Sequence, residues 1–170
     1  YQSFKISVSH TTRKPRSNEI DGVDYYFVSK EQFQQLINEK KFYEYAKIFD
    51  NYYGTLKKSV DETFKKNDII FDIDWQGTKQ LSKFKNLNLI KIFLLPPSKN
   101  ELKLRLVKRN QDLPEEVERR FKGFDNDILH WVDYDYIIIN ENLENCYKQI
   151  ENIILKNKRN QSLSYNSVIS

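Results

Sequence analysis

The sequence predicts an α/β fold in which a largely parallel sheet is flanked by helices. Nearly continuous apolar runs at residues 68–74, 89–95 and 136–139 are typical of strands buried on both faces of a sheet. Segments with helical spacing or helix caps separate these runs, and that alternation favours the α/β class. The 170 residues, 39% of them hydrophobic, are enough for one domain with a sizeable core.

Caps and spacing place the other elements. Ser29 with Gln32 forms a capping box at the start of a helix, and Ser98 with Glu101 caps another that runs to about Lys108. The remaining elements are strands at 4–9 and 25–28, a strand or turn at 42–49, a turn at 51–54, a short helix at 58–66, an amphipathic helix at 143–156 and a polar, frayed or disordered tail at 157–170.

The composition indicates a cytoplasmic protein. Cys146 is the single cysteine, so no internal disulfide can form, and no apolar run reaches the length of a membrane span. The formal charge of +4 is spread along the chain, which is compatible with a phosphorylated ligand and gives little support to nucleic-acid binding. The sequence contains no Met, which is explained either by removal of an initiator or by loss of a longer N-terminal segment.

The strongest local signal is the segment from Ser9 to Arg16, followed by Glu19 and Tyr25. Two arginines beside hydroxyl groups can grip a phosphate, because the guanidinium fork offers paired donors to its oxygens. From spacing alone, Arg13 and Arg16 could equally be solvated loop cations, with Glu19 as a surface partner.

The pattern V-S-x-T-T-R-x-P-R-x-x-E-x-x-G-x-D-Y-x-F, which begins at Val8, is similar to the GMP-binding signature of guanylate kinases. Residues 42–46, 51–55 and 72–77 resemble the next three motifs of that family in order. The resemblance implies a P-loop nucleoside monophosphate kinase-like fold in one domain. It places a GMP-binding subdomain at about 8–70, the core at 71–107 and 126–156, and a lid at about 108–125.

The same resemblance implies roles on the GMP side. A carboxylate can accept both donors on the guanine edge, so Glu44 is the candidate base reader, although an exposed strand glutamate is the alternative. Its expected polar companions are Ser9, Thr55 and Asp74. Four residues would hold the phosphate, with Glu19 orienting the arginine pair: Arg13, Arg16, Tyr25 and Tyr53.

On the donor side the resemblance implies Mg²⁺ and ATP. Asp72 follows an apolar strand, where such enzymes place an acid near Mg²⁺, here through water; a cap or turn acid is the alternative. Arg105, Arg109 and Arg120 would act catalytically by neutralising charge on the transferring phosphoryl group. Arg109 and Asn140 would also contact ATP. The competing interpretation of these arginines is helical salt bridges to Glu115, Glu116 and Glu118.

The lid departs from the family pattern. Asn110 stands where a glycine is usual, and Leu113 with Pro114 replaces a small hydroxyl-bearing stretch. Pro114 can still serve as the first residue of a helix, so we expect altered lid mobility rather than loss of the arginines.

The sequence contains no G-x-x-x-x-G-K-[ST], which the family places ahead of the first predicted strand. We therefore expect such a loop upstream of Tyr1 and no useful phosphorylation of GMP by these 170 residues alone. The resemblance implies an ATP:GMP phosphotransferase of purine nucleotide metabolism, with GMP and ATP as partners and no membrane or nucleic acid. The alternative is a catalytically silent guanylate-kinase-like module that binds proteins.

Overall fold

The computed structural model describes residues 4–64, 68–109 and 114–168. Two compact units divide the chain at Asn88 and Leu89, and each is described by itself. The predicted lid residues Asn110 and Leu113 lie outside the described residues. Pro114 is the first residue of a helix, as predicted.

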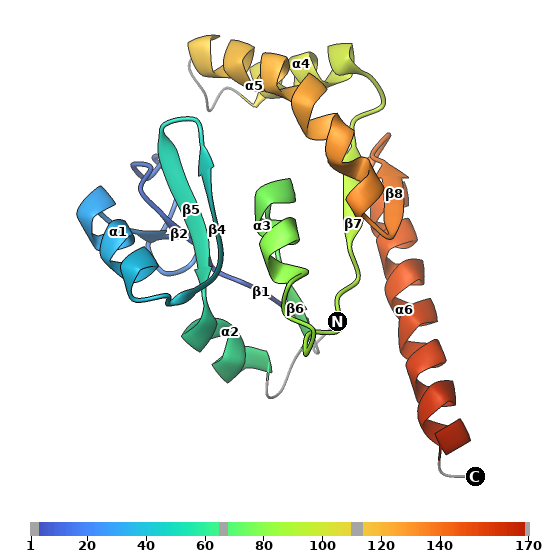
Figure 1. The fold of residues 1–170 in the computed structure, drawn as a ribbon. Helices are drawn as coiled ribbons and strands as arrows, with labels where there is room; N and C mark the ends of the chain where they lie inside the picture. The colour runs from blue at the N-terminus through green and yellow to red at the C-terminus, as the bar shows by residue number, and fades with distance from the viewer. Residues whose placement is uncertain (1–3, 65–67, 110–113, 169–170) are drawn as a thin grey trace. The chain divides into compact units, whose positions relative to one another are not determined.

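The first unit is built on a four-stranded mixed sheet with strand order β3-β2-β5-β4 (Figure 1). Its long strands, β4 (Phe42–Ile48) and β5 (Asn51–Leu56), pair antiparallel, and β4 forms the edge. Two short strands, β2 (His10–Thr11) and β3 (Tyr26–Phe27), pair in parallel on the other side of β5. A second, two-stranded parallel sheet joins β1 (Phe4–Ile6) to β6 (Asp68–Ile70).

Helix α1 (Lys30–Asn38) covers this sheet and supplies the centre of its core. The predicted capping box is confirmed, since Ser29 accepts from the N–H of Gln32 while the Gln32 side chain accepts from the N–H of Ser29. Phe33 has no exposed surface and stacks on Phe42 and Tyr52 at centroid distances of 4.6 and 5.4 Å. These stacked rings fix the helix on strands β4 and β5.

Two further helices complete the first unit. Helix α2 (Lys57–Phe64) follows β5 directly. Helix α3 (Trp75–Leu81) begins at its N-cap Asp74, whose carboxylate accepts from the N–H of Gly77 at 3.0 Å. Figure 1 shows α3 beside β4, at the open edge of the four-stranded sheet.

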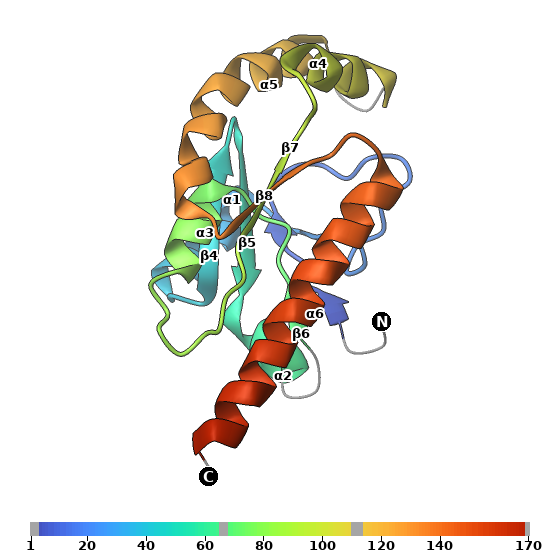
Figure 2. The ribbon, with the colours of Figure 1, turned by 90° about the vertical axis from the view of Figure 1, so that its right-hand side faces the viewer.

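The second unit pairs β7 (Ile92–Leu95) in parallel with β8 (Tyr136–Ile139). Helix α4 (Lys99–Lys108) starts at the predicted cap Ser98, which accepts from the N–H of Glu101. Helix α5 (Pro114–Asp127) continues into a 3-10 helix, η1 (Ile128–Asp133), which precedes β8. The last helix, α6 (Leu143–Val168), follows β8 in Figure 2.

Three predictions about single elements are wrong in detail. Residues 51–54 belong to β5 rather than to a turn, and the chain turns at Phe49 and Asp50, where Phe49 has a φ of 55°. The last helix ends at Val168 instead of Lys156, because neither Gly nor Pro interrupts it. The apolar runs are not strands buried on both faces. The run at 68–74 is a strand only over its first three residues, and in the three strands that form from these runs four apolar side chains are 41–51% exposed: Ile70, Leu94, Ile137 and Ile139.

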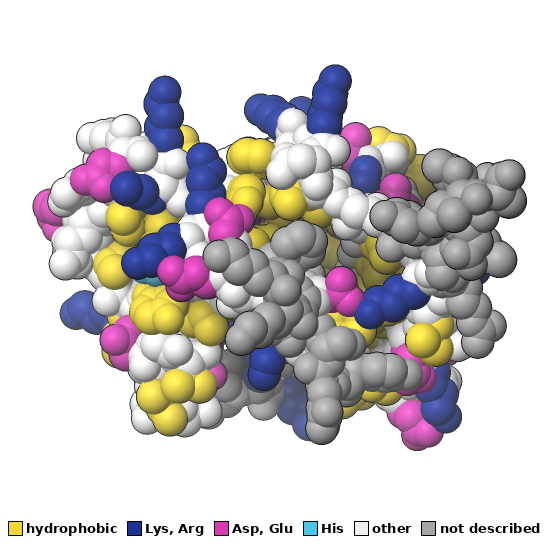
Figure 3. Space-filling view, turned by 90° about the horizontal axis from the view of Figure 1, so that it is seen from below, with side chains coloured by type: hydrophobic (Ala, Val, Ile, Leu, Met, Phe, Trp, Pro, Cys, Tyr) yellow, Lys and Arg dark blue, Asp and Glu magenta, His cyan; other side chains and the backbone are white. Residues whose placement is uncertain are grey.

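Charged side chains of both signs are interspersed on the described part of the face in Figure 3. This mixing agrees with the small net charge of +4. Among the residues that the structure describes, none of the helices is both long and apolar enough to cross a membrane.

We expect Phe33→Ala to lower the free energy of unfolding of the first unit by about 3–5 kcal/mol, because it removes a fully buried ring from the core. Ile20→Ala, at a side chain that is 61% exposed, should change it by less than about 0.5 kcal/mol. Urea denaturation followed by Trp75 fluorescence in a Trp131→Phe background measures both. Equal effects of the two substitutions would contradict the proposed core.

Candidate functional site

The side chain of Glu44, on strand β4, is buried within the first unit. Only 2% of this residue is exposed, and in the described part of the chain its Oε1 atom has no hydrogen-bond partner. Burial, and then the charge of Asp74, raise the pKa of the Glu44 carboxyl group to about 7, while hydrogen bonds from the side chain and backbone of Thr55 act in the opposite direction. The carboxyl group of Glu44 can therefore accept hydrogen bonds from further donors.

The predicted polar companions of Glu44 lie in the same part of the first unit. Thr55 lies opposite Glu44 in the β4–β5 register and is fully buried. The hydroxyl groups of Ser9 and Thr55 are 3.1 Å apart. Asp74 is held at the start of α3, where its Oδ2 atom accepts from Gln76 at 2.9 Å. The structure thus brings together the predicted base-reading set of Ser9, Glu44, Thr55 and Asp74.

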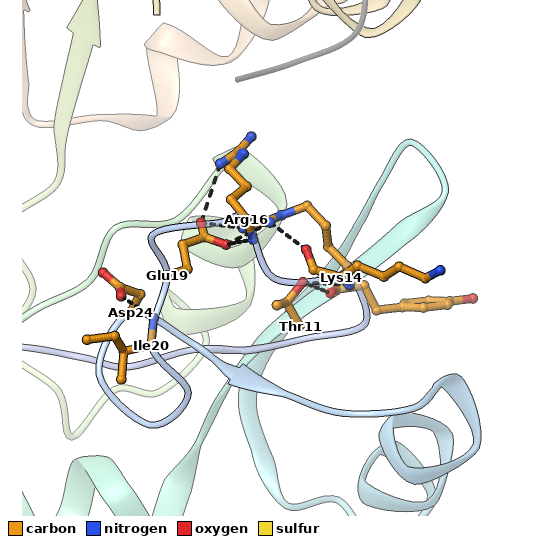
Figure 4. A network of polar contacts seen from close by, with 8 residues as sticks. Thr11, Lys14, Arg16, Glu19, Ile20 and Asp24 are labelled. Atoms are coloured by element: carbon orange, nitrogen blue, oxygen red, sulfur yellow. Dashed lines mark hydrogen bonds and ion pairs between the residues drawn. The ribbon is translucent and has the colours of Figure 1, made fainter. Parts of the chain in front are cut away.

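Glu19 organises the loop after β2, as shown in Figure 4. The guanidinium group of Arg13 donates to both carboxylate oxygens of Glu19, at 2.9 and 2.8 Å. The backbone N–H of Arg16 donates to Glu19 at 2.7 Å, and the Arg16 guanidinium group lies 3.5 Å from the same carboxylate. The hydrogen bond from Arg13 is the main reason that the pKa of Glu19 is lowered. Glu19 is therefore an ionised anchor that orients both arginines.

Two tyrosines complete this loop. The rings of Tyr25 and Tyr53 are 6.1 Å apart, and the Arg13 guanidinium carbon lies 5.4 Å from the centre of the Tyr25 ring. The pKa of Arg13 is raised, first by its hydrogen bond to Glu19 and also by Tyr53. Burial raises the pKa of Tyr25, and the charge of Asp72 adds to that effect. Both predicted tyrosines therefore lie beside the arginine loop.

Asp72 lies in the segment between β6 and α3 and is exposed. It is not the helix cap, because Asp74 fills that position. Within the described ranges, His, Cys, Asp and Glu side chains form no group of three or more that could hold a metal ion. A single exposed carboxylate fits a Mg²⁺ ion whose other ligands are water and phosphate oxygens.

In the second unit, the guanidinium group of Arg105 forms hydrogen bonds with nearby groups of the same unit. It donates to Glu101 at 2.7 Å and to the carbonyl oxygens of Asn140 and Glu141 at 2.9 and 3.2 Å. Its acidic partner is therefore Glu101 rather than the glutamates of α5. Arg109 caps the C-terminus of α4 and is exposed, whereas Arg120 is half-buried on α5. Their predicted contacts with ATP stay predictions.

Three residues without a role predicted from the sequence also shape this site. Thr11 donates to the carbonyl oxygen of Tyr52 at 3.0 Å and accepts from the N–H of Arg13 at 3.2 Å, which orders the arginine loop. Gly77 and Gln80, on α3, contact Glu44 and its neighbour Tyr45. Thr11 and Gly77 lie inside recognised motifs, whereas nothing in the sequence pattern singles out Gln80.

The sequence and the fold both resemble those of known proteins. The guanylate kinase family model matches residues 1–157. The chain is 42% identical to the guanylate kinase of Baumannia cicadellinicola over 98% of this chain and 83% of the relative. It is 44% identical to that of Clostridioides difficile over 98% of this chain and 82% of the relative. The crystal structure of guanylate kinase from Anaplasma phagocytophilum superposes with a TM-score of 0.77 and 34% identity, covering 92% of this chain and 77% of that one.

The fold and these relatives place the chain among the nucleoside monophosphate kinases of the P-loop class. Within that class, the chain belongs to the guanylate kinase family.

We expect Glu44→Gln to stabilise the ligand-free chain more at high pH than at low pH. A carboxyl group whose pKa is raised from 4.5 to about 7 on folding contributes stability below the lower value and loses it as the pH rises through the higher one. Glutamine does not titrate. The difference in unfolding free energy between variant and parent should therefore shift in favour of the variant by about 2–3 kcal/mol between about pH 5 and pH 8.

Urea denaturation at the two pH values measures this shift, and all groups that titrate alike in both proteins cancel in the difference. Glu31→Gln, at an exposed glutamate of α1, is the matched control. A difference between variant and parent that stays constant with pH would show that the carboxyl group of Glu44 titrates normally.

Proposed function

We propose that this chain provides the GMP site and the core of a guanylate kinase, an enzyme that transfers the γ-phosphoryl group of ATP to GMP and yields GDP and ADP. The observation that carries the proposal is the buried, incompletely hydrogen-bonded carboxyl group of Glu44 on the same sheet as the Arg13–Glu19 loop. A group that reads a base edge and a group that holds a phosphate are what a mononucleotide site requires.

Guanine presents two adjacent donors, the ring N1–H and the exocyclic amine. An ionised Glu44 offers one acceptor oxygen to each of them. Adenine lacks this pair of donors, so its binding would leave the carboxylate buried and unpaired, which is costly. Ser9, Thr55 and Asp74 are the polar companions of Glu44 in this proposal, since contacts within the first unit bring them together.

The phosphate of GMP would bind at the arginine loop. Glu19 holds Arg13 and Arg16 in one place, so little side-chain entropy is lost when a phosphate binds. The phenol groups of Tyr25 and Tyr53 add donors beside Arg13. This support justifies the proposed GMP-binding subdomain at about residues 8–70.

For the donor side we retain the predicted assignments as proposals. Asp72 would hold a water ligand of Mg²⁺, which supplies charge neutralisation on the phosphates of ATP. Arg109 and Arg120, with Arg105 held between Glu101 and Asn140, would face the triphosphate from a lid at about residues 108–125. Asn140 would contact ATP. We place the reaction in the cytoplasm, in purine nucleotide metabolism.

Turnover needs more than the acceptor site. The 170 residues contain no G-x-x-x-x-G-K-[ST] loop, whose backbone N–H groups and lysine hold donor phosphates in P-loop enzymes. We expect these residues alone to bind GMP in calorimetry but to give no useful rate in a coupled ATP-consumption assay with Mg²⁺. Rapid turnover would show that another cluster binds ATP.

We expect Glu44→Gln and Arg16→Ala to separate base selection from phosphate capture. Glutamine presents one acceptor and an unwanted donor, so the preference for GMP over AMP should fall by about 10- to 100-fold, which corresponds to a mismatch of about 1–3 kcal/mol. Arg16→Ala should weaken binding of both nucleotides and leave their ratio unchanged. Equilibrium dissociation constants from calorimetry measure both effects.

The control for these variants is Lys14→Ala, at an exposed side chain of the same loop. It should leave the GMP-to-AMP ratio unchanged. A ratio that Glu44→Gln leaves intact would exclude Glu44 as the guanine reader and remove the main support for the proposed function.

A further inference from the structure

Helix α3 is joined to the edge strand β4 by side-chain amides. Gln76 donates to the carbonyl oxygen of Lys47 at 3.5 Å, and Gln80 makes two shorter hydrogen bonds. The Oε1 atom of Gln80 accepts from the N–H of Tyr45 at 3.1 Å, and its Nε2 atom donates to the carbonyl oxygen of Tyr45 at 2.6 Å. Because β4 is the edge strand, these two peptide groups point away from β5. The amide of Gln80 pairs with them as a neighbouring strand would.

The two hydrogen bonds from Gln80 to Tyr45 also fix α3 next to Glu44, the residue before Tyr45. The backbone of α3 reaches Glu44 at Gly77, where an added Cβ would lie 2.6 Å from the Glu44 Oε2 atom and 3.2 Å from its carboxyl carbon. A separation under 3.0 Å cannot be accommodated without displacement. The carboxyl group of Glu44 therefore occupies the space that a side chain at position 77 would need, and a larger residue there would displace it.

The first turn of α3 is itself held in place. Asp74 accepts from the N–H of Gly77 at 3.0 Å, and its backbone carbonyl oxygen accepts from the Thr78 hydroxyl group at 3.0 Å. The side chain of Thr78 is buried. The segment that contacts Glu44 is thus fixed at one end by a cap and at the other by the amide of Gln80.

We propose that α3 is a positioning element for the base-reading carboxylate, in which Gln80 holds the helix on the edge of β4 and Gly77 confines the side chain of Glu44. This inference rests on the proposed function and deepens it, because it assigns base selectivity to two residues that need not contact the nucleotide. Bidentate acceptance requires both carboxylate oxygens in the plane of the guanine edge. A displacement of about 1 Å disrupts such geometry severely.

The sensitive probe is inosine monophosphate, which keeps the ring N1–H of GMP and lacks its exocyclic amine. A correctly placed carboxylate distinguishes the two nucleotides through that amine, whereas the sugar and phosphate contacts are common to both. The ratio of their dissociation constants therefore reports the position of the carboxylate. General weakening of the fold would change both constants by the same factor.

We expect Gly77→Ala and Gln80→Glu each to lower the preference for GMP over inosine monophosphate by about tenfold or more, because both displace the carboxylate. Gln80→Glu keeps the side-chain size and replaces the donor to Tyr45 by an acceptor. Lys79→Ala, at an exposed position of α3, and Gln35→Ala, at an exposed glutamine of α1, should leave the ratio unchanged. Calorimetry on the folded chain measures all of them.

A double-mutant cycle separates positioning from damage elsewhere. In a Glu44→Ala background, Gly77→Ala should change the ratio no further, because the displaced group is gone. A further drop in the ratio there would overturn the proposal, as would an unchanged ratio in Gln80→Glu. A parent chain without preference for GMP over AMP and inosine monophosphate would instead refute the proposed function. If Gly77→Ala does not fold, Gln80→Glu decides alone.

Discussion

The burial of the Glu44 carboxyl group is the constraint around which the rest of the acceptor site is arranged. Removing an ionisable group from water costs several kcal/mol unless partners compensate, and here one oxygen has no hydrogen-bond partner among the described residues. Hydrogen bonds from Thr55 on the neighbouring strand favour the charged form, whereas the charge of Asp74 at the helix cap opposes it. Gly77, without a side chain, leaves the space that the Glu44 Oε2 atom occupies. A site that bears such a cost in its free state gains correspondingly when a ligand provides two donors.

Two glutamates of the first unit have opposite environments, and these environments account for different tasks. Glu19 accepts from the Arg13 guanidinium group and the Arg16 backbone, so its pKa is lowered and it stays ionised. Glu44 lacks such a cation among the interactions that shift its pKa, and its pKa is raised. The charge of Glu19 is compensated by the arginines and keeps them in place. The carboxyl group of Glu44 has no such compensation, and we propose that it selects the ligand.

Sequence reasoning predicted the parts that depend on local pattern. The capping box at Ser29, the N-cap at Ser98 and the helix start at Pro114 follow from residue type and spacing, and the structure confirms them. Of the two possibilities for residues 42–49, a strand or a turn, the structure shows a strand over Phe42–Ile48. It also brings together the two clusters that the family motifs indicated, around Glu44 and around Arg13. The turn predicted at residues 51–54 is wrong. Asn and Gly, here Asn51 and Gly54, are common in turns, yet pairing with β4 and β2 makes this segment a strand.

The contacts of α3 could not be predicted, because they join residues far apart in the chain through side chains with no distinctive pattern. From the sequence alone, Gln80 is indistinguishable from a solvent-exposed glutamine. Its role follows only from its two hydrogen bonds to the backbone of Tyr45 on the edge strand β4. Arg105 is a similar case, since its bonds to the carbonyl oxygens of Asn140 and Glu141 connect α4 to the end of β8. Periodicity locates helices and strands but does not show which polar side chain meets which peptide group.

Strand β5 links the two clusters and fixes the distance between them. Tyr53 lies beside the arginine loop and Thr55 beside Glu44, and residues two apart on a strand share a face at a separation of about 6.7 Å. Both strands that flank β5 hold it by backbone hydrogen bonds, so this spacing is set by the sheet and not by a loop. The groups proposed to read the base and to bind the phosphate therefore keep a fixed separation. In the proposed function, a nucleotide of the wrong base would occupy the arginine loop only by leaving Glu44 unpaired. The rigid strand β5 would in this way make the buried carboxyl group selective for guanine.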